Sequence, residues 1–259
     1  MRIVRVVLAL FLQNLTREME FKNSFFINTF LTIGWFGSTL VTVYLLFLHT
    51  NNLAGWTKQQ VFLLLGIYRI IESVANSSFR ANFERLPYWI ENGELDLFLT
   101  KPVPTQLLLS FRYFRIFELP NLLAAIGLVV WALVQTGFTI SNVFLGIIFT
   151  FLGLLILYAL WFAISQIAFW TTRLTSLWEI FNLTQTPGMV PISVYEGTVR
   201  FILTIIIPVA FVTTVPAQAF VGLLSWQYAL GAIIICAAFL YGSNRLFRVA
   251  LRTYSSASS

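Results

Sequence analysis

The sequence predicts an all-α integral membrane protein with six transmembrane helices and both termini in the cytoplasm. Three observations support this fold class. Only 10% of the 259 residues are charged, the mean hydropathy is +0.83, and several apolar segments are about 20 residues long. A soluble domain carries about 25% charged residues, so lipid must cover much of this surface. Continuous apolar segments indicate helices, because the strands of a membrane barrel alternate apolar and polar residues.

The N-terminal residues 1–24 do not form a span. Arg2 and Arg5 precede a brief apolar run, and no cleavage site of small residues follows it. We expect an amphipathic helix that lies at the cytoplasmic membrane interface. Residues 25–259 then form a single transmembrane domain. Its predicted spans are residues 25–48, 60–80, 111–134, 143–170, 174–194 and 226–247.

The fifth span has two possible positions. Residues 174–194 contain Glu179 and Pro187, whereas the more apolar stretch 198–222 is interrupted by Pro208. Hydropathy alone favours residues 198–222. Either position gives six crossings, the even number that two cytoplasmic termini require.

Basic residues predict the orientation. Cytoplasmic loops carry an excess of Lys and Arg, and with the N-terminus inside, thirteen of the sixteen basic residues fall on the cytoplasmic side. Lys58 and Arg200 fall outside, and Arg69 lies within a span. The thirteen are Arg2, Arg5, Arg17, Lys22, Arg80, Arg85, Lys101, Arg112, Arg115, Arg173, Arg245, Arg248 and Arg252.

Composition excludes several kinds of catalytic site. None of the three lysines follows a glycine, so the chain has no GxxxxGK[ST] phosphate loop. The single histidine, His49, excludes an HExxH motif, and the single cysteine, Cys236, excludes an internal disulfide. We expect no intrinsic catalytic site, no metal and no nucleic-acid partner, because the basic residues serve the topology. If the protein uses ATP, another chain binds it.

The second predicted span carries a polar face. Arg69, Glu72, Ser73 and Asn76 recur at spacings of three and four, so they share one side of the helix. A charge in mid-bilayer costs about 2.5–3.5 kcal/mol, so this face must meet protein or water. Two interpretations stay open. The face lines a transport pathway, or it forms a structural ion pair that holds the helix to a neighbour or to a partner subunit.

The cytoplasmic region 84–104 mixes large apolar residues with acids, and it is too short and too charged to span. It predicts an amphipathic turn and helix. A groove in a partner protein suits such a helix better than the membrane surface, because the cytoplasmic leaflet is itself negative. The expected docking residues are Tyr88, Trp89, Glu91, Gly93, Glu94, Asp96, Phe98, Lys101 and Pro102.

Two segments resemble the permease subunits of ABC-2-type ABC exporters. The sequence GELDLFLTKPVP, at residues 93–104, is similar to the coupling-helix region of that family. Residues 191–222 resemble the family's segment before the last span, although Glu196 stands where the family often has proline. The matching positions are Tyr195, Arg200, Pro208, Ala210, Phe211, Pro216 and Ala217.

This resemblance implies a topology and partners. Residues 174–194 would be the fifth span, and residues 198–222 would be re-entrant half-helices that dip in from outside. The permease would sit in the bacterial inner membrane and pair with a second permease, identical or related, with a heterodimer favoured. Two cytoplasmic ATPase subunits would bind ATP and Mg. Their closure would act through the coupling helix, and substrate would leave between the two permeases.

Two other classes of function stay open. A membrane anchor or assembly subunit would use the same cytoplasmic segment only to recruit a partner. An intramembrane lipid-modifying enzyme would need a nucleophile and a base, and the sequence indicates no such pair. The transported substrate is not indicated, because one permease would supply only half of a shared pathway.

Overall fold

A computed structural model describes residues 2–171 and 176–254 of the chain. The described residues form helices and turns, without a strand longer than a single bridge between Leu53 and Trp56. The α-helices are α1 (Arg2–Glu20), α2 (Lys22–His49), α3 (Lys58–Ala75), α4 (Ala81–Glu91), α5 (Leu95–Leu99), α6 (Thr105–Phe111), α7 (Leu119–Thr136), α8 (Ile140–Ser165), α9 (Leu177–Gln185), α10 (Gly197–Phe201), α11 (Val215–Phe220) and α12 (Trp226–Thr253).

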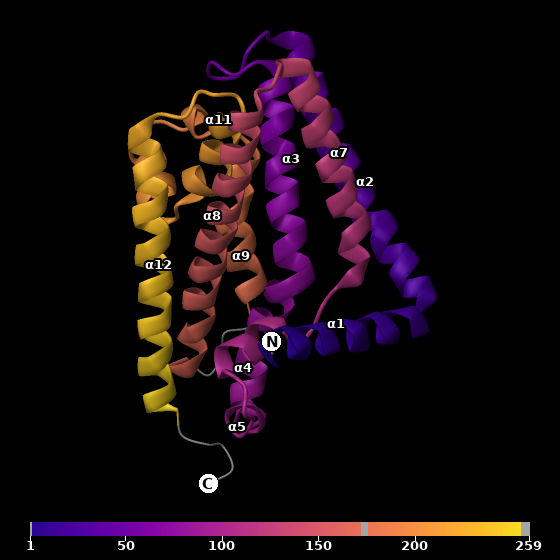
Figure 1. Ribbon diagram of the computed structural model, residues 1–259, viewed down its shortest axis with the longest axis vertical. Coiled ribbons are helices and arrows are strands. Elements are labelled where there is room, and N and C mark those ends of the chain that lie inside the picture. The colour runs from indigo at the N-terminus through magenta and orange to yellow at the C-terminus, as the bar shows by residue number, and fades with distance from the viewer. Residues whose placement is uncertain (1, 172–175, 255–259) are drawn as a thin grey trace.

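Five helical stretches of the described chain are long and apolar enough to cross a membrane, and a bent helix pair brings the number to six if it counts as one span. This confirms an all-helical membrane protein. Figure 1 shows these stretches running roughly side by side along the long axis of the molecule. The five stretches are Lys22–His49, Lys58–Glu91, Ile116–Thr136, Ile140–Phe169 and Trp226–Thr253.

Helix α1 lies crosswise to the long helices, at the same end of the molecule as α4, α5 and the last turn of α12 (Figure 1). It ends at Glu20, and α2 begins at Lys22. The first span therefore starts three residues before the predicted Phe25. The exposed apolar side chains of α1 include Val4, Leu8 and Leu12.

The sequence predicted that the second span ends at Arg80. In the structure, the helix that contains this span continues past Arg80. Helix α3 begins with a capping box between Thr57 and Gln60. It continues through a π-helical turn, η1 (Asn76–Arg80), directly into α4, so one helical stretch of 34 residues reaches Glu91. Pro87 lies inside α4 without ending it. The polar composition after residue 80 marks the point where the helix leaves the apolar zone, and it does not mark the end of the helix.

The third span begins later than residue 111. Helix α6 ends at Phe111, an irregular stretch follows, and helical structure resumes at the short η2 (Ile116–Glu118) before α7. The Glu18 carboxylate accepts the backbone N–H of Ile116 at 2.9 Å and of Phe117 at 3.1 Å. This carboxylate from α1 satisfies donors that a helix start leaves unpaired, and α7 then carries Pro120 in its first turn. Sequence alone could not show a cap supplied about a hundred residues away.

The predicted fifth span, 174–194, is not one continuous helix. Residues 174 and 175 and the cytoplasmic Arg173 lie outside the described residues. Helix α9 is nine residues long, and a 3₁₀ turn at Thr186–Met189 (η4) follows it. Pro187 has no N–H to donate and Pro191 follows closely, so a regular helix cannot continue.

The segment nevertheless connects two distant levels of the bundle. Arg80 donates from its Nη2 to the Trp178 carbonyl at 3.3 Å, in the half of the 34-residue helix that leads to α4. Ser193 donates from its hydroxyl to the Ala54 carbonyl at 3.1 Å, in the α2–α3 loop at the opposite end. Residues 178–193 therefore run the length between these levels as a broken helix.

Residues 197–220 form two helical arms bent by 70° at a break around Pro208. The first arm is α10 with the π-helical η6 (Ile202–Ile206), and the second is η7 (Ala210–Thr214) with α11. The pair starts just after Ser193, beside the α2–α3 loop, and ends where Gly222 lies against Asn142 at the beginning of α8. The pair as a whole thus begins and ends at the same end of the bundle. This differs from the straight span that hydropathy favoured, because proline interrupts the middle of the segment.

Candidate functional site

The end of the 34-residue helix and α5 make a compact hairpin in the region predicted to be cytoplasmic. Helix α4 stops at Glu91, and Gly93 adopts a φ of +70°, a left-handed conformation that glycine reaches without a steric penalty. The chain then reverses into α5, which lies beyond the bundle in Figure 1. A turn and short helix were predicted for this region.

Two of the predicted docking residues are buried and cannot form an outer surface. Trp89 is 2% exposed and Phe98 is 1% exposed, and their rings lie 4.8 Å apart between centroids. Leu95 is fully buried beside them. These side chains hold α5 against α4, so their role is to support the hairpin. The apolar pattern of the sequence did not show which side chains hold α5 against α4 and which are free to contact a partner, because both roles use large apolar side chains.

The outward side of the hairpin is apolar and acidic. We call the exposed residues Tyr88, Glu91, Leu97 and Leu99 the exposed tip. Tyr88 is 56% exposed and Leu97 is 63% exposed. Leu97 and Leu99 were absent from the predicted docking set. Their alternation with the buried Phe98 was the available signal, since successive positions of a single helical turn face different sides.

The other predicted docking residues are spread around the hairpin. Lys101 and Pro102 are exposed in the turn after α5, whereas Gly93, Glu94 and Asp96 are half-buried. Asp96 lies close enough to Tyr254, just after α12, that its charge and hydrogen bonding add to burial in raising the pKa of that phenol. The end of the last helix therefore rests beside α5.

A buried amide joins the hairpin to the third span. Asn82 is fully buried, and its Nδ2 donates to the carbonyls of Ser110 at 3.0 Å and Tyr113 at 2.9 Å. Its Oδ1 accepts the Tyr113 N–H at 2.9 Å. These bonds satisfy the backbone where α6 ends, and buried backbone groups need such partners. They hold α4 against the end of α6 and the irregular stretch that leads to η2 and α7.

Arg80 ties the same helix to α8 and α9. Its side chain is 5% exposed, and it pairs with Glu84 at 2.8 Å. Its Nη2 donates to Asn182 Oδ1 at 2.7 Å, and the guanidinium lies 5.3 Å from the centre of the Trp161 ring. Glu84 also pairs with Arg115 at 3.2 Å. The cluster joins four chain segments below the level of the polar face.

The predicted ion pair of the polar face is present within this chain. Arg69 and Glu72 are 2.5 Å apart, with side chains 4% and 15% exposed. Arg69 also donates to Thr39 of α2 at 3.0 Å, and Tyr68 donates to Glu72 at 3.4 Å. The charges are thus satisfied by α2 and α3 without a second subunit, although the Nε of Arg69 has no hydrogen-bond partner among the described residues.

Ser73 and Asn76 face the beginning of the third span. Asn121 donates to Ser73 Oγ at 3.2 Å and to Glu118 at 3.4 Å, and Asn76 donates to the same carboxylate at 3.5 Å. A groove of about 220 Å³ runs along these residues. It is lined by Leu31, Thr32, Trp35, Arg69, Glu72, Asn76, Glu118 and Asn121. Asn121 was not predicted, although an amide directly after Pro120 in an apolar span was a usable signal.

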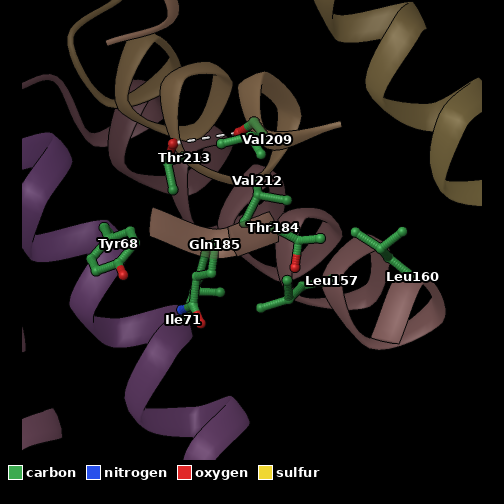
Figure 2. A pocket seen from close by; sticks show the side chains of 9 residues that line it. All are labelled: Tyr68, Ile71, Leu157, Leu160, Thr184, Gln185, Val209, Val212 and Thr213. Carbon is green, nitrogen blue, oxygen red and sulfur yellow. Dashed lines mark hydrogen bonds between the residues drawn. The ribbon is translucent and has the colours of Figure 1, made fainter. Parts of the chain in front are cut away.

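The interior of the bundle is almost closed. Figure 2 shows side chains from α3, α8, α9 and η7 converging below the bend of the helix pair. The cavity between them has a volume of about 10 Å³, close to the minimum for one water molecule. Gln185 lines it, and its Nε2 has no hydrogen-bond partner among the described residues. In this conformation the cavity below the bend admits no solute larger than water, whereas an apolar cavity of about 410 Å³ lies between α3, α7 and α8.

The comparisons with known proteins fit this arrangement. A family model described as ABC-2 family transporter protein matches residues 33–258. The chain belongs to the ABC-2 transporter family. It is therefore the membrane permease of an ABC-type transporter, and this family works with ATP-binding subunits. The comparisons with curated proteins and with solved structures found no match.

The re-entrant residues predicted for this ABC-2 permease lie around its bent helix pair. Pro208 stands at the bend and Pro216 in the first turn of α11. Tyr195 donates from its hydroxyl to the Pro187 carbonyl at 3.2 Å, which braces the chain before the first arm. Arg200 is exposed on α10. The four residues of the permease thus shape one element, and they do not converge on a common site.

Proposed function

We propose that this chain is the permease subunit of an ABC-2 exporter and that separate cytoplasmic ATPase subunits drive it through the exposed tip. The observation that carries the proposal is the 34-residue helical stretch Lys58–Glu91. It joins Tyr88 and Glu91 of the exposed tip to the Arg69–Glu72 pair without a loop between them, and α5 with Leu97 and Leu99 packs against its end. A partner that moves the tip therefore moves the buried polar face with it.

The length of this stretch supports a lever that reaches out of the membrane. At about 1.5 Å per residue, 34 residues extend about 51 Å. The bilayer with its headgroups is about 40–45 Å thick. The stretch is thus long enough for its last turns to stand in the cytoplasm, where an ATPase can contact them. Leu97 and Leu99 supply the apolar anchors that a docking interface requires.

We place the transport pathway between two permeases. The cavity below the bend has room for about one water molecule, and the larger cavity between α3, α7 and α8 is lined almost entirely by apolar side chains. The polar groove beside Arg69, Glu72 and Glu118, in contrast, is open at the surface of the bundle. A second permease, identical or related, would close this groove and supply the other wall. Export, as opposed to import, follows the resemblance of the residues 93–104 and 191–222 to exporter permeases.

We propose six crossings with both termini in the cytoplasm of a bacterial inner membrane. The five long stretches supply five crossings, and the broken segment 178–193 supplies the remaining one. The bent pair 197–220 is then re-entrant from the outside. The interfacial position of α1 accords with its crosswise placement (Figure 1).

ATP hydrolysis belongs to the partner subunits in this proposal. The chain has no lysine after a glycine and hence no phosphate loop of its own. ATP and Mg would be bound by the ATPase subunits alone, and this permease would carry no catalytic site and no metal.

The exposed tip is tested by copurification of the ATPase subunits with the permease. Leu97→Asp should weaken the complex by at least about tenfold, because truncation of a central interface residue costs about 2 kcal/mol or more. Glu91→Lys should weaken it less, since this residue lies at the edge of the tip. Glu196→Lys is the matched control, because it reverses an exposed glutamate at the opposite end of the bundle.

An undiminished complex and undiminished ATP-driven transport in Leu97→Asp would overturn the assignment of the docking surface. Lost ATPase binding in Leu97→Asp together with no detectable transport by the parent complex would favour the anchor subunit. Transport activity of the parent complex is therefore measured in the same preparation, in sealed vesicles with ATP.

A further inference from the structure

A cationic pocket lies between α1 and the turn that follows α5. Its volume is about 410 Å³. Arg17 of α1, Lys101 of the turn and Arg112 at the end of α6 all line it, together with Gln13, Asn14 and Tyr113. Three positive side chains from three separate segments thus meet around one cavity. The proposed docking function uses none of these three charges.

Helix periodicity and one buried amide build the α1 wall of this pocket. Residues 13, 14 and 17 follow one another at spacings that place them on one face of α1. Asn14 is 4% exposed, and its Nδ2 donates to the Arg112 carbonyl at 3.0 Å. This bond fixes α1 beside the end of α6, so the wall is a packed contact.

Aromatic rings hold the three cations in place. The Arg112 guanidinium lies 4.8 Å from the centre of the Phe98 ring, and Lys101 Nζ lies 5.9 Å from the same ring. The Arg17 guanidinium lies 5.3 Å from the centre of the Tyr113 ring. Ring faces attract cations without neutralising them. The positive charge of the pocket is therefore kept and also positioned.

Within the described chain, no acidic side chain lines the cavity. The ion pairs of the described residues involve Arg69, Arg80 and Arg115. The nearest acid in sequence, Glu18, points its carboxylate at the Ile116 and Phe117 N–H groups. Burial raises the pKa of Glu18, and its two backbone hydrogen bonds and the charges of Arg17 and Arg115 oppose that shift. Three cations without a lining carboxylate make a site for an anion.

The position of α1 indicates where this anion comes from. The exposed apolar residues Val4, Leu8 and Leu12 recur every four residues, on the side of α1 opposite to the pocket. An interfacial helix buries such a face about 5–10 Å deep, and a helix with its side chains is about 10 Å thick. The opposite face of α1 then lies at the level of the lipid headgroups.

We propose that this pocket binds a phosphate group, supplied by an anionic phospholipid headgroup of the cytoplasmic leaflet. The arginine guanidinium groups offer paired N–H donors that suit phosphate oxygens, and the Lys101 ammonium adds a point charge. A bound headgroup would bridge α1 to the turn after α5. The bound headgroup would thereby hold the hairpin of α4 and α5 at a fixed height relative to the membrane.

The test measures binding of phosphatidylglycerol to the purified complex by native mass spectrometry, with phosphatidylcholine as the neutral lipid. Each basic side chain near an anionic surface contributes about fivefold in affinity. The triple variant Arg17→Gln, Lys101→Gln, Arg112→Gln should therefore bind phosphatidylglycerol roughly 100-fold more weakly. The matched control is Arg245→Gln, Arg248→Gln, Arg252→Gln, which removes the same charge from α12. Because these arginines also follow a membrane span, this variant measures the contribution of general surface charge, and it should lose less affinity than the pocket variant.

A second arm titrates inorganic phosphate against the thermal stability of the same proteins. Weaker lipid binding in the pocket variant than in the control variant supports the headgroup as the source. A phosphate-dependent stabilisation that is lost only in the pocket variant, without any lipid difference, supports the phosphate site with a soluble ligand. Equal behaviour of the pocket and control variants in both arms overturns the proposal. The single variant Lys101→Gln guards against misfolding, because this side chain is exposed and makes no hydrogen bond to the described residues. It should lose about fivefold in affinity.

Discussion

Arg69 and Glu72 show how a single residue pair makes a charged side chain tolerable inside a membrane helix. The pair is close, and Thr39 and Tyr68 complete its hydrogen bonding from within the same chain. A buried pair gains little net stability over apolar residues, but removing one partner leaves an uncompensated charge. These contacts explain how the pair is held. Its exposure to the 220 Å³ groove keeps a role in transport open.

The first prediction separates these roles by a double-mutant comparison. Arg69→Leu alone should destabilise the permease by about 3–5 kcal/mol, because Glu72 is then left unpaired. Arg69→Leu combined with Glu72→Met should recover most of that stability, as measured by thermal unfolding in detergent. Transport in the double variant then reports the pathway directly. If the double variant is as unstable as Arg69→Leu, the two charges depend on separate partners, and the structural pair is rejected.

At the scale of elements, glycines decide how closely the bent pair approaches α8. A Cβ at Gly153 would lie 2.7 Å from the Val212 carbonyl oxygen, and a Cβ at Gly146 would lie 2.3 Å from the Phe220 ring. The two glycines are seven residues apart, which places them on one face of α8. The sequence has no GxxxG motif, yet this longer spacing lets α8 approach the backbone at Val212 and the ring of Phe220 closely.

The prediction at this scale concerns Gly153→Ala. Because the opposing atom is backbone, the added methyl group must push η7 away, and overpacking of this kind costs about 1–3 kcal/mol. The thermal unfolding temperature should fall accordingly. Gly127→Ala is the matched control, since this glycine is also helical and nothing lies within 4 Å of its added Cβ. An equal effect of the two substitutions would mean that helix propensity, and not the contact with Val212, explains the result.

At the scale of the whole molecule, the bent pair distinguishes two topologies. A re-entrant pair has both ends outside, whereas a straight span would place its ends on opposite sides. The structure brings the start of the pair to the α2–α3 loop and its end to the beginning of α8. We therefore expect residues 196 and 223 on the same side of the membrane.

Cysteine labelling in intact cells tests this topology. The background is Cys236→Ala, which removes the single native thiol. A membrane-impermeant maleimide should label both Glu196→Cys and Leu223→Cys from outside, because both positions are exposed at that end. Glu91→Cys should react only after lysis and serves as the cytoplasmic control. Labelling of only one of the two outer positions would restore residues 198–222 as a span.

The sequence by itself predicted the class of the molecule and most of its long helices, because lipid as a solvent imposes a strong requirement on composition and length. It also located the hairpin of α4 and α5 and the Arg69–Glu72 pair, since spacing along a helix determines which side chains meet. The polar face could be predicted from the residues alone for the same reason.

Only the tertiary structure decided which residues of the hairpin are buried and which are exposed. Trp89 and Phe98 pack inward while Leu97 and Leu99 face out, and apolar character alone cannot separate these cases. The structure also supplied the Glu18 cap, the broken segment 178–193 and the cationic pocket of Arg17, Lys101 and Arg112. Each of these joins residues far apart in the chain. Such contacts depend on how helices pack, which a local sequence pattern does not encode.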